Sequence, residues 1–359
     1  MSRSVFAERS HIMFKILEVS GSPYQRGYQH GKEMKEQVSS TLLFNKNKME
    51  KLWQSPWDRI KESIKDYYTY LLIHEPDYIE EMKGISKGAE IPFDDIFAMN
   101  CRYEISRMGM DRDLCCSLIG VNENNQTIAA ENWDWSLAQK KNIVILKIAY
   151  ENGLKILTVT EAGMIGRLGI NNRGLAVLGN TLKTTNVGLG LPIHCTFRKL
   201  LEQEKIEDAK KVLSETKIAS SYNFMIASYG HIYDFEVDYQ SVKCVNEEQP
   251  VQYHTNHFTD IDLRKIEAYT KYEDEESIKR YESIERQVKT FDSIGKKEIM
   301  QILSSHDNHP QGVCTHSKEG VSEDKKWSTL CSVYFDLKTM EILIACGNPC
   351  MEPYERIEI

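Results

Sequence analysis

Residues 113–135 read DLCCSLIGVNENNQTIAAENWDW, and this stretch contains the pattern that decides the fold. Two runs of β-forming residues, CSLIGV and QTIAAEN, are separated by the pair Asn124–Asn125, which is typical of a hairpin turn. Because a hairpin returns the end of its second strand to the start of its first, we expect Asp134 to come near Cys116. Free cysteines are usually core residues, so the spacing alone leaves a structural role for Cys116 open.

The flanking sequence predicts an α+β layered sandwich. In residues 22–107 apolar side chains recur every three or four positions, with breaks near Pro56, Pro76 and Pro92. This spacing predicts a helical N-terminal third. Short β-rich runs with turn residues between them then fill residues 115–181, and we interpret them as an antiparallel meander. Alternating βαβ units, which would indicate a parallel sheet, are not evident.

The second half of the chain alternates between the two patterns. A helical pair is expected at 193–204 and 206–215, and a charged helix within 260–297 that we interpret as a solvated surface element. The later strands are expected in the runs NFMIAS, IYDFEV, SVKCV, TLCSVYFD and EILIACG.

Composition limits the function classes. The 359 residues are 41% hydrophobic and 27% charged with a formal net charge of −8, which favours a soluble protein and argues against nucleic acid or an anionic membrane as a partner. The first twenty residues lack the apolar core of a secretory signal, so we expect a cytoplasmic protein. Most of its nine cysteines should then be free thiols.

Several separated blocks resemble one known family. The pair Cys116–Ser117, followed by Asn132-Trp133-Asp134, resembles the processing site of the acyl-coenzyme A:6-aminopenicillanate acyltransferase family, also called isopenicillin N acyltransferase-like, a branch of the N-terminal nucleophile (Ntn) hydrolases. Further matching blocks are GSPYQRGYQHG at 21–31, NCRYEI at 100–105, TEAGMIGRLGINNRGLAVLGN at 160–180, HTNHF at 254–258 and GNP at 347–349.

The resemblance implies a fold and a way of maturing. We expect the four-layer αββα sandwich of Ntn hydrolases, with two stacked antiparallel sheets, formed as one domain. Cleavage between Cys115 and Cys116 would divide the chain into an N-terminal α fragment, residues 1–115, which stays bound, and a β fragment, residues 116–359.

The resemblance also implies the site residues. Cys116 would be the nucleophile, Asp134 would position its amine and thiol, and Asn256 and Asn180 would be active-site amides, with Asn256 in the oxyanion hole. We expect Ser117, Trp133 and Glu131, which neighbour these residues, to contact the substrate. No cofactor and no metal are needed for this chemistry.

The chemistry fits an N-terminal cysteine. A thiol with its ordinary pKa of about 8.5 needs a base at neutral pH, and an α-amino group with a pKa of about 7.7–8.0 can serve. The expected partners are a small amide, a peptide or an acyl thioester, and a homo-oligomer is compatible with the sequence. Hydrolysis and acyl transfer would use the same residues, so the sequence leaves that choice open.

Some positions depart from the family pattern. Cys115 stands where glycine is more usual, which leaves open which of the two sulfur atoms is the nucleophile. The number of residues between the cysteine and Asp134 favours Cys116. Related bile-salt and penicillin V amide hydrolases have arginines where this chain has Glu131 and, near the C-terminal strand, Ser328 and Thr329. We therefore expect a substrate that those arginines do not recognise.

Two rival functions remain. His306, His309, Cys314 and His316 lie close together in sequence and would suit a metal-dependent hydrolase, although a typical fourth ligand and paired spacing are missing; His254 and His257 form a second pair. The other rival is a non-catalytic binding protein of the same fold.

Overall fold

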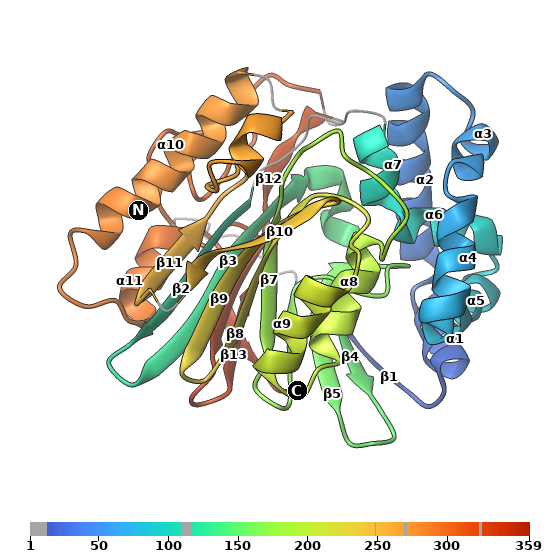
Figure 1. Ribbon diagram of the computed structural model, residues 1–359, viewed down its shortest axis with the longest axis horizontal. Helices are drawn as coiled ribbons and strands as arrows, with labels where there is room; N and C mark the ends of the chain where they lie inside the picture. The colour runs from blue at the N-terminus through green and yellow to red at the C-terminus, as the bar shows by residue number, and fades with distance from the viewer. Residues whose placement is uncertain (1–12, 109–115, 248, 269–270, 323–324) are drawn as a thin grey trace, which may run out of the picture.

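The computed structural model describes residues 13–108, 116–247, 249–268, 271–322 and 325–359 (Figure 1). Its strands form two sheets, one of eight strands and one of six. In Figure 1 the sheets lie in the middle of the molecule, with the helices of the N-terminal third on one side and α10 and α11 on the other. Cys115, the residue expected before the cleavage point, lies outside the described residues.

The eight-stranded sheet contains β1, the only strand assigned within residues 13–108. β1 pairs with β4 in parallel, and every other neighbouring pair in this sheet is antiparallel. In spatial order its strands are β1 (Lys15–Ser20), β4 (Ile143–Ala149), β5 (Lys155–Glu161), β6 (Gly169–Asn171), β7 (Ala176–Thr181), β8 (Tyr222–Ser228), β9 (His231–Asp238) and β10 (Ser241–Glu247).

The six-stranded sheet is antiparallel throughout and contains the Cys116 hairpin. Within that hairpin Cys116 pairs with Trp133, and Glu123 pairs with Gln126 next to the turn. In spatial order its strands are β11 (Val251–His254), β2 (Cys116–Glu123), β3 (Gln126–Ser136), β12 (Trp327–Asp336), β13 (Glu341–Ala345) and β14 (Tyr354–Ile357).

Helices cover both outer faces. The 3-10 helices are η1 (Leu137–Asn142) and η2 (Leu263–Ile266), and the α-helices are α1 (Pro23–Glu33), α2 (Lys35–Trp53), α3 (Trp57–Glu62), α4 (Lys65–His74), α5 (Pro76–Ala89), α6 (Phe93–Asn100), α7 (Arg102–Met108), α8 (Ile193–Leu201), α9 (Ile206–Glu215), α10 (Lys271–Val288) and α11 (Lys296–Leu303).

The strand side chains divide the core into layers. Successive side chains of a strand point to opposite faces, and β4 shows this: Val144 packs with the helices of the N-terminal third, whereas Ile145 packs against the six-stranded sheet. In β2, likewise, Leu118 faces the other sheet and Ile119 packs with residues of α10 and α11. The αββα four-layer sandwich expected from the family resemblance is therefore confirmed.

Local sequence signals explain how the helical layer forms. Ser22 and Gln25 form a capping box in which each side chain accepts a hydrogen bond from the backbone N–H of the other, with Pro23 at the first helical position of α1, as expected at a helix start. α1 then approaches α5 closely: a Cβ built on Gly27 would lie 1.9 Å from the carbonyl oxygen of Glu81. Only glycine permits this contact.

The structure corrects three expectations about the elements. The meander is interrupted, because β2 and β3 belong to the six-stranded sheet and the next four strands to the other. β1, β11 and β14 were not expected from the sequence. The charged helix α10 is not simply a solvated element: Ser277, Arg280, Ser283 and Ile284 on one of its faces are buried.

Candidate active site

Cys116 is the first residue of β2, an inner strand of the six-stranded sheet. Its side chain is 3% exposed. Its Sγ lies 4.0 Å from the carbonyl oxygen of Asp134 and 4.0 Å from Nη2 of Arg167. Burial raises the pKa of this thiol, the nearby Glu131 raises it further, and Arg167 opposes both effects. In the intact chain the sulfur is therefore held mainly as a thiol.

Asn256 lies directly against the backbone of Cys116. The backbone nitrogen of Cys116 donates to Asn256 Oδ1 at 2.8 Å, and Arg280 Nη2 donates to the same oxygen at 2.7 Å. Two donors converging on one atom require the amide oxygen at that position. Nδ2 donates to the carbonyl oxygen of Thr181 at 3.1 Å, and Ser277 Oγ accepts from the Asn256 backbone N–H at 2.8 Å, so both ends of the residue are held in place.

Asp134 is held by two threonines. Its Oδ1 accepts from Thr329 Oγ1 at 2.6 Å, and its Oδ2 accepts from Thr315 Oγ1 at 2.7 Å. Burial raises the pKa of this carboxyl group to about 7, against the lowering effect of the two hydroxyl groups. Asp134 contacts the sulfur of Cys116 through its backbone carbonyl, while its carboxylate is occupied by the threonines.

Arg167 supplies a positive charge beside the nucleophile. It is buried, its guanidinium lies 4.1 Å from the centre of the Trp133 ring, and its Nη1 donates to the hydroxyl oxygen of Tyr103. A cation over an indole face is favourable, and more so when desolvated. Trp133 therefore positions the arginine, and Arg167 in turn lies against the sulfur.

Glu131 is a buried carboxyl group, in contrast to the arginine of related amide hydrolases. Its Oε2 accepts from the backbone N–H of Gly179 at 2.9 Å. Burial raises its pKa to about 8, and the charge of Arg167 opposes that rise. At neutral pH a large share of Glu131 is therefore neutral. Arg167 nevertheless places a guanidinium next to Cys116, which the sequence comparison at Glu131 and Thr329 did not anticipate.

Asn180, near the end of β7, has a side-chain donor that lacks an acceptor in the described part of the chain. Its Oδ1 lies 3.1 Å from His254 Nδ1, whereas its buried Nδ2 has no hydrogen-bond partner among the described residues. His254 Nε2 in turn lies 3.0 Å from Glu236 Oε1. The next residue, Thr181, binds Asn256 through its carbonyl oxygen, so Asn180 lies one residue from the network around Cys116.

The predicted residues lie on both faces of the six-stranded sheet. The side chains of Cys116 and Trp133 point between the two sheets. Glu131, two residues before Trp133 on the same strand, is expected to face the same way. Ser117 and Asp134 lie at the alternate positions, which face α10 and α11, and Ser117 Oγ is buried with no partner in the described part of the chain. The structure thus brings Cys116 together with Asn256, Trp133 and the Asp134 backbone, and it separates Ser117 from the sulfur by the thickness of the strand.

Sequence reasoning missed the residues that come from distant elements. They are Arg167, Arg280, Thr315 and Thr329. A signal existed for Arg280: Ser277, Arg280 and Ile284 recur at helical spacing in an otherwise charged segment, which indicates a buried helix face.

The histidines divide into two groups. His254 belongs to the Glu236 and Asn180 network, and burial lowers the pKa of His257 to about 3. In the described parts of the chain, one group of side chains has a geometry that could hold a metal ion, and it consists of His306, Cys314, His316 and Cys350. Cys350 is the fourth ligand that was missing from the sequence pattern.

Comparison with known proteins assigns the chain to a family. The model of the acyl-coenzyme A:6-aminopenicillanic acid acyl-transferase family matches residues 121–350, a range that begins within β2 and includes Asp134, Asn180 and Asn256. The chain belongs to this family of Ntn hydrolase relatives. Its described residues contain no helix with the length and apolar character needed to cross a membrane.

Individual relatives are distant. The chain is 27% identical over 332 residues to the acyl-coenzyme A:6-aminopenicillanic-acid-acyltransferase 40 kDa form of Emericella nidulans, covering 92% of this chain and 91% of the relative. It is 21% identical over 388 aligned positions to the β-alanyl-dopamine/carcinine hydrolase of Drosophila melanogaster, covering 96% of each. Among solved structures, a variant of conjugated bile acid hydrolase from Clostridium perfringens matches with a TM-score of 0.45 and 13% identity, covering 68% of this chain and 97% of that one.

Proposed function

We propose that the chain cleaves itself before Cys116 and then acts as an N-terminal cysteine amidohydrolase or acyltransferase. The observation that carries this proposal is the hydrogen bond from the Cys116 backbone nitrogen to Asn256 Oδ1. An acceptor held by Arg280 and Ser277 is suited to keep that nitrogen in place both as a peptide N–H and, after cleavage, as a free amine.

The self-cleavage step uses the same sulfur as turnover. Cys116 Sγ attacks the carbonyl carbon of Cys115, the C–N bond to the Cys116 nitrogen breaks, and the thiol proton passes to that nitrogen. The product is a thioester, which water hydrolyses to a Cys115 carboxylate and a free Cys116 thiol. Cleavage thereby creates the α-amine, whose ordinary pKa of about 7.7–8.0 suits a base at neutral pH.

The α fragment, residues 1–115, would remain bound after cleavage. β1 pairs with β4 along six residues, from Lys15 opposite Val144 to Ser20 opposite Ala149. Buried ion pairs also join the two fragments, including Arg102 with Glu161 and Glu81 with Arg198. Separation would expose the shared apolar layer between the fragments to water, which is strongly unfavourable.

In turnover, Cys116 Sγ attacks the carbonyl carbon of a substrate amide or acyl thioester, and its α-amine takes the thiol proton. The C–N or C–S bond then breaks, the α-amine returns the proton to the leaving group, and the acyl group stays on the sulfur. Water or an amine releases it. Asn180 Nδ2 has no acceptor among the described residues, whereas Asn256 Nδ2 already donates to the carbonyl oxygen of Thr181. Asn180, in place of the Asn256 that the family resemblance implied, is therefore the group best suited to donate to the oxyanion, a contribution typically worth about 10²–10³ in rate.

Arg167 would support the thiolate. Its guanidinium is the positive charge nearest to the sulfur among the contacts described above, and it lowers the pKa of Cys116 against the effect of burial. Glu131 and Trp133 then act on the nucleophile through Arg167 as well as at the substrate. A small amide, a peptide or an acyl thioester remains the proposed substrate class.

The relatives' names suggest two probes: β-alanyl-dopamine, and an acyl-coenzyme A supplied with 6-aminopenicillanic acid, for which we choose hexanoyl-coenzyme A as a simple acyl donor. The wild-type protein should release β-alanine from the first or transfer the acyl group of the second, and acid quenching should trap the acyl group on the fragment beginning at Cys116. Hydroxylamine should remove that group, because it cleaves thioesters. Cys116→Ala should do neither reaction, and turnover by Cys116→Ala at the wild-type rate would contradict the proposal.

A further inference from the structure

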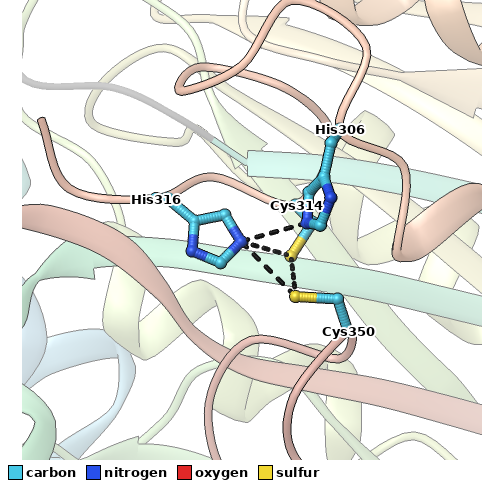
Figure 2. A group of neighbouring side chains, drawn as sticks. All are labelled: His306, Cys314, His316 and Cys350. Carbon is cyan, nitrogen blue, oxygen red and sulfur yellow. Dashed lines mark hydrogen bonds between the residues drawn. The ribbon is translucent and has the colours of Figure 1, made fainter.

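A cluster of two histidines and two cysteines lies apart from the nucleophile, on the loops that precede β12 and follow β13. His306, Cys314 and His316 belong to the segment between α11 and β12, and Cys350 follows β13. Figure 2 shows the two sulfur atoms and the His316 ring nitrogen turned toward a common point, with His306 completing the group.

Four of the six distances between ligand atoms in the cluster are close to those of a tetrahedral metal site. Cys314 Sγ lies 3.5 Å from Cys350 Sγ and 3.5 Å from His316 Nε2. His316 Nε2 lies 3.4 Å from Cys350 Sγ and 3.1 Å from His306 Nε2, and all four ligand atoms lie within 4.8 Å of one another. Zinc bonds of about 2.0–2.3 Å place tetrahedral ligands about 3.3–3.8 Å apart, so only small adjustments would bring the four atoms around one ion.

We propose that His306, Cys314, His316 and Cys350 bind one structural Zn²⁺ ion. Two thiolates and two neutral imidazoles are a common ligand set for zinc. On binding, each cysteine releases its thiol proton to solvent and each histidine binds through Nε2. The ion would tie the loop before β12 to the loop after β13.

The surrounding contacts already hold these two loops together. Asn348, two residues before Cys350, donates from Nδ2 to the carbonyl oxygen of Thr315 at 2.7 Å and lies 3.3 Å from Cys314 Sγ. Ser328 Oγ donates to Asn348 Oδ1 at 2.9 Å. A partner that positions a ligand-bearing segment is typical of metal sites.

The ligand set is that of a structural site. Four protein ligands fill a tetrahedral sphere and leave no position for a reactive water, in contrast to catalytic zinc sites with three protein ligands. His309 is not a member of the group. The cluster therefore does not favour the metal-dependent hydrolase considered from the sequence.

The site would nevertheless affect the nucleophile indirectly. Thr315 lies between two ligands, Cys314 and His316, and its hydroxyl group donates to Asp134 Oδ2. The backbone carbonyl of Asp134 contacts Cys116 Sγ. Zinc would thus fix the loop that positions Asp134, without touching the reacting atoms.

The direct test is the metal content of tag-free protein, measured by inductively coupled plasma mass spectrometry after dialysis. The wild type should contain about one zinc ion per chain. The zinc content of Cys350→Ser and of His316→Ala should each be lower than that of the wild type by about tenfold or more. His309→Ala, beside the cluster, and Cys244→Ser, on an exposed position of β10, should retain the wild-type amount.

A second measurement starts from the wild type, so its main result does not depend on a variant folding. Removing zinc from the wild type with 1,10-phenanthroline should lower its melting temperature, and adding Zn²⁺ back should restore it. Substitution by Co²⁺ should produce a thiolate-to-cobalt charge-transfer band that is absent from Cys350→Ser. Wild-type protein that contains no zinc after incubation with Zn²⁺, or Cys350→Ser that retains it fully, would overturn the proposal.

One alternative has its own signature. Cys314 and Cys350 could instead form a disulfide, even in protein that is purified under reducing conditions. In that case these two cysteines will not react with iodoacetamide until a strong reductant is added. Zinc-bound thiolates instead become reactive when the chelator is added without a reductant. The disulfide result would also overturn the proposal.

Discussion

The backbone nitrogen of Cys116 donates a hydrogen bond to Asn256 Oδ1 at 2.8 Å, although the two residues are 140 positions apart in sequence. Arg280 donates to the same oxygen, and Ser277 accepts from the Asn256 backbone. The segment around Asn256 and helix α10 thus form a support for the first residue of β2. An atom that is an ordinary peptide nitrogen in the intact chain is already held as a catalytic amine would need to be.

Removing this acceptor should slow maturation. Asn256→Ala leaves the Cys116 N–H without its partner, and we expect self-cleavage to become about 10²-fold slower, because a small misplacement of reacting groups costs about that much in rate. A time course of intact mass after expression measures this rate. Asn152→Ala, at an exposed turn, is the control and should mature normally. Equal rates in the two variants would contradict the role of Asn256.

The hydrogen bonds that the two threonine hydroxyl groups donate to the Asp134 carboxylate should contribute to stability. Thr315→Val leaves Asp134 Oδ2 without a donor, and a buried acceptor without its partner costs about 1–3 kcal/mol. Urea unfolding should show this loss in a Cys116→Ala background, where every chain is uncleaved. Thr315→Ser keeps the hydroxyl group and should lose much less. A Thr315→Val protein as stable as its parent would show that this hydrogen bond contributes nothing.

Glu131 should make the protein less stable as pH rises. Its pKa is raised to about 8 by burial, from an ordinary value of 4.5, so the folded protein binds a proton that the unfolded chain has already released. This contribution is complete below about pH 4.5 and is lost as pH rises through about 8. Glu131→Gln keeps an acceptor for Gly179 and does not ionise. The melting temperature of Glu131→Gln relative to the wild type should therefore rise between about pH 5 and pH 8 and level off above that, and a difference that stays constant across this range would argue against the raised pKa.

Arg167 should set the pH dependence of the sulfur. Because Arg167 lowers the pKa of Cys116 against burial and Glu131, Arg167→Met should raise that pKa further. The pH–rate profile of self-cleavage should move to higher pH, and Arg167→Lys, which keeps a positive charge, should move less. An unchanged profile in Arg167→Met would separate this arginine from the nucleophile.

The parts of the account that the sequence predicted are mainly local. The hairpin of β2 and β3 could be predicted because its strands are adjacent in sequence and its turn residues are distinctive, and the helical third was visible in its apolar spacing. The division of strands between two sheets could not be read in the same way. Strand pairing such as β1 with β4 joins residues more than a hundred positions apart, and neither strand shows its partner by pattern alone.

The supporting residues of the site were hidden for a similar reason. Arg280 lies in a segment rich in charged residues, many of which are exposed, so the sequence gives little sign that this one arginine is buried. Cys350 lies 34 residues from His316, so its place beside the histidines depends on the fold of β12 and β13. Resemblance to the family supplied Asp134, Asn180 and Asn256 as candidates, and their contacts came only from the structure.

The most direct measurement is the mass and N-terminal sequence of the purified wild type and of Cys116→Ala. The wild type should give two fragments, one ending at Cys115 and one whose sequence begins Cys-Ser-Leu-Ile, still associated when the native protein is examined by size exclusion. Cys116→Ala should remain a single chain. An active wild-type protein that stays intact, or a Cys116→Ala chain that is cut at the same bond, would contradict the account.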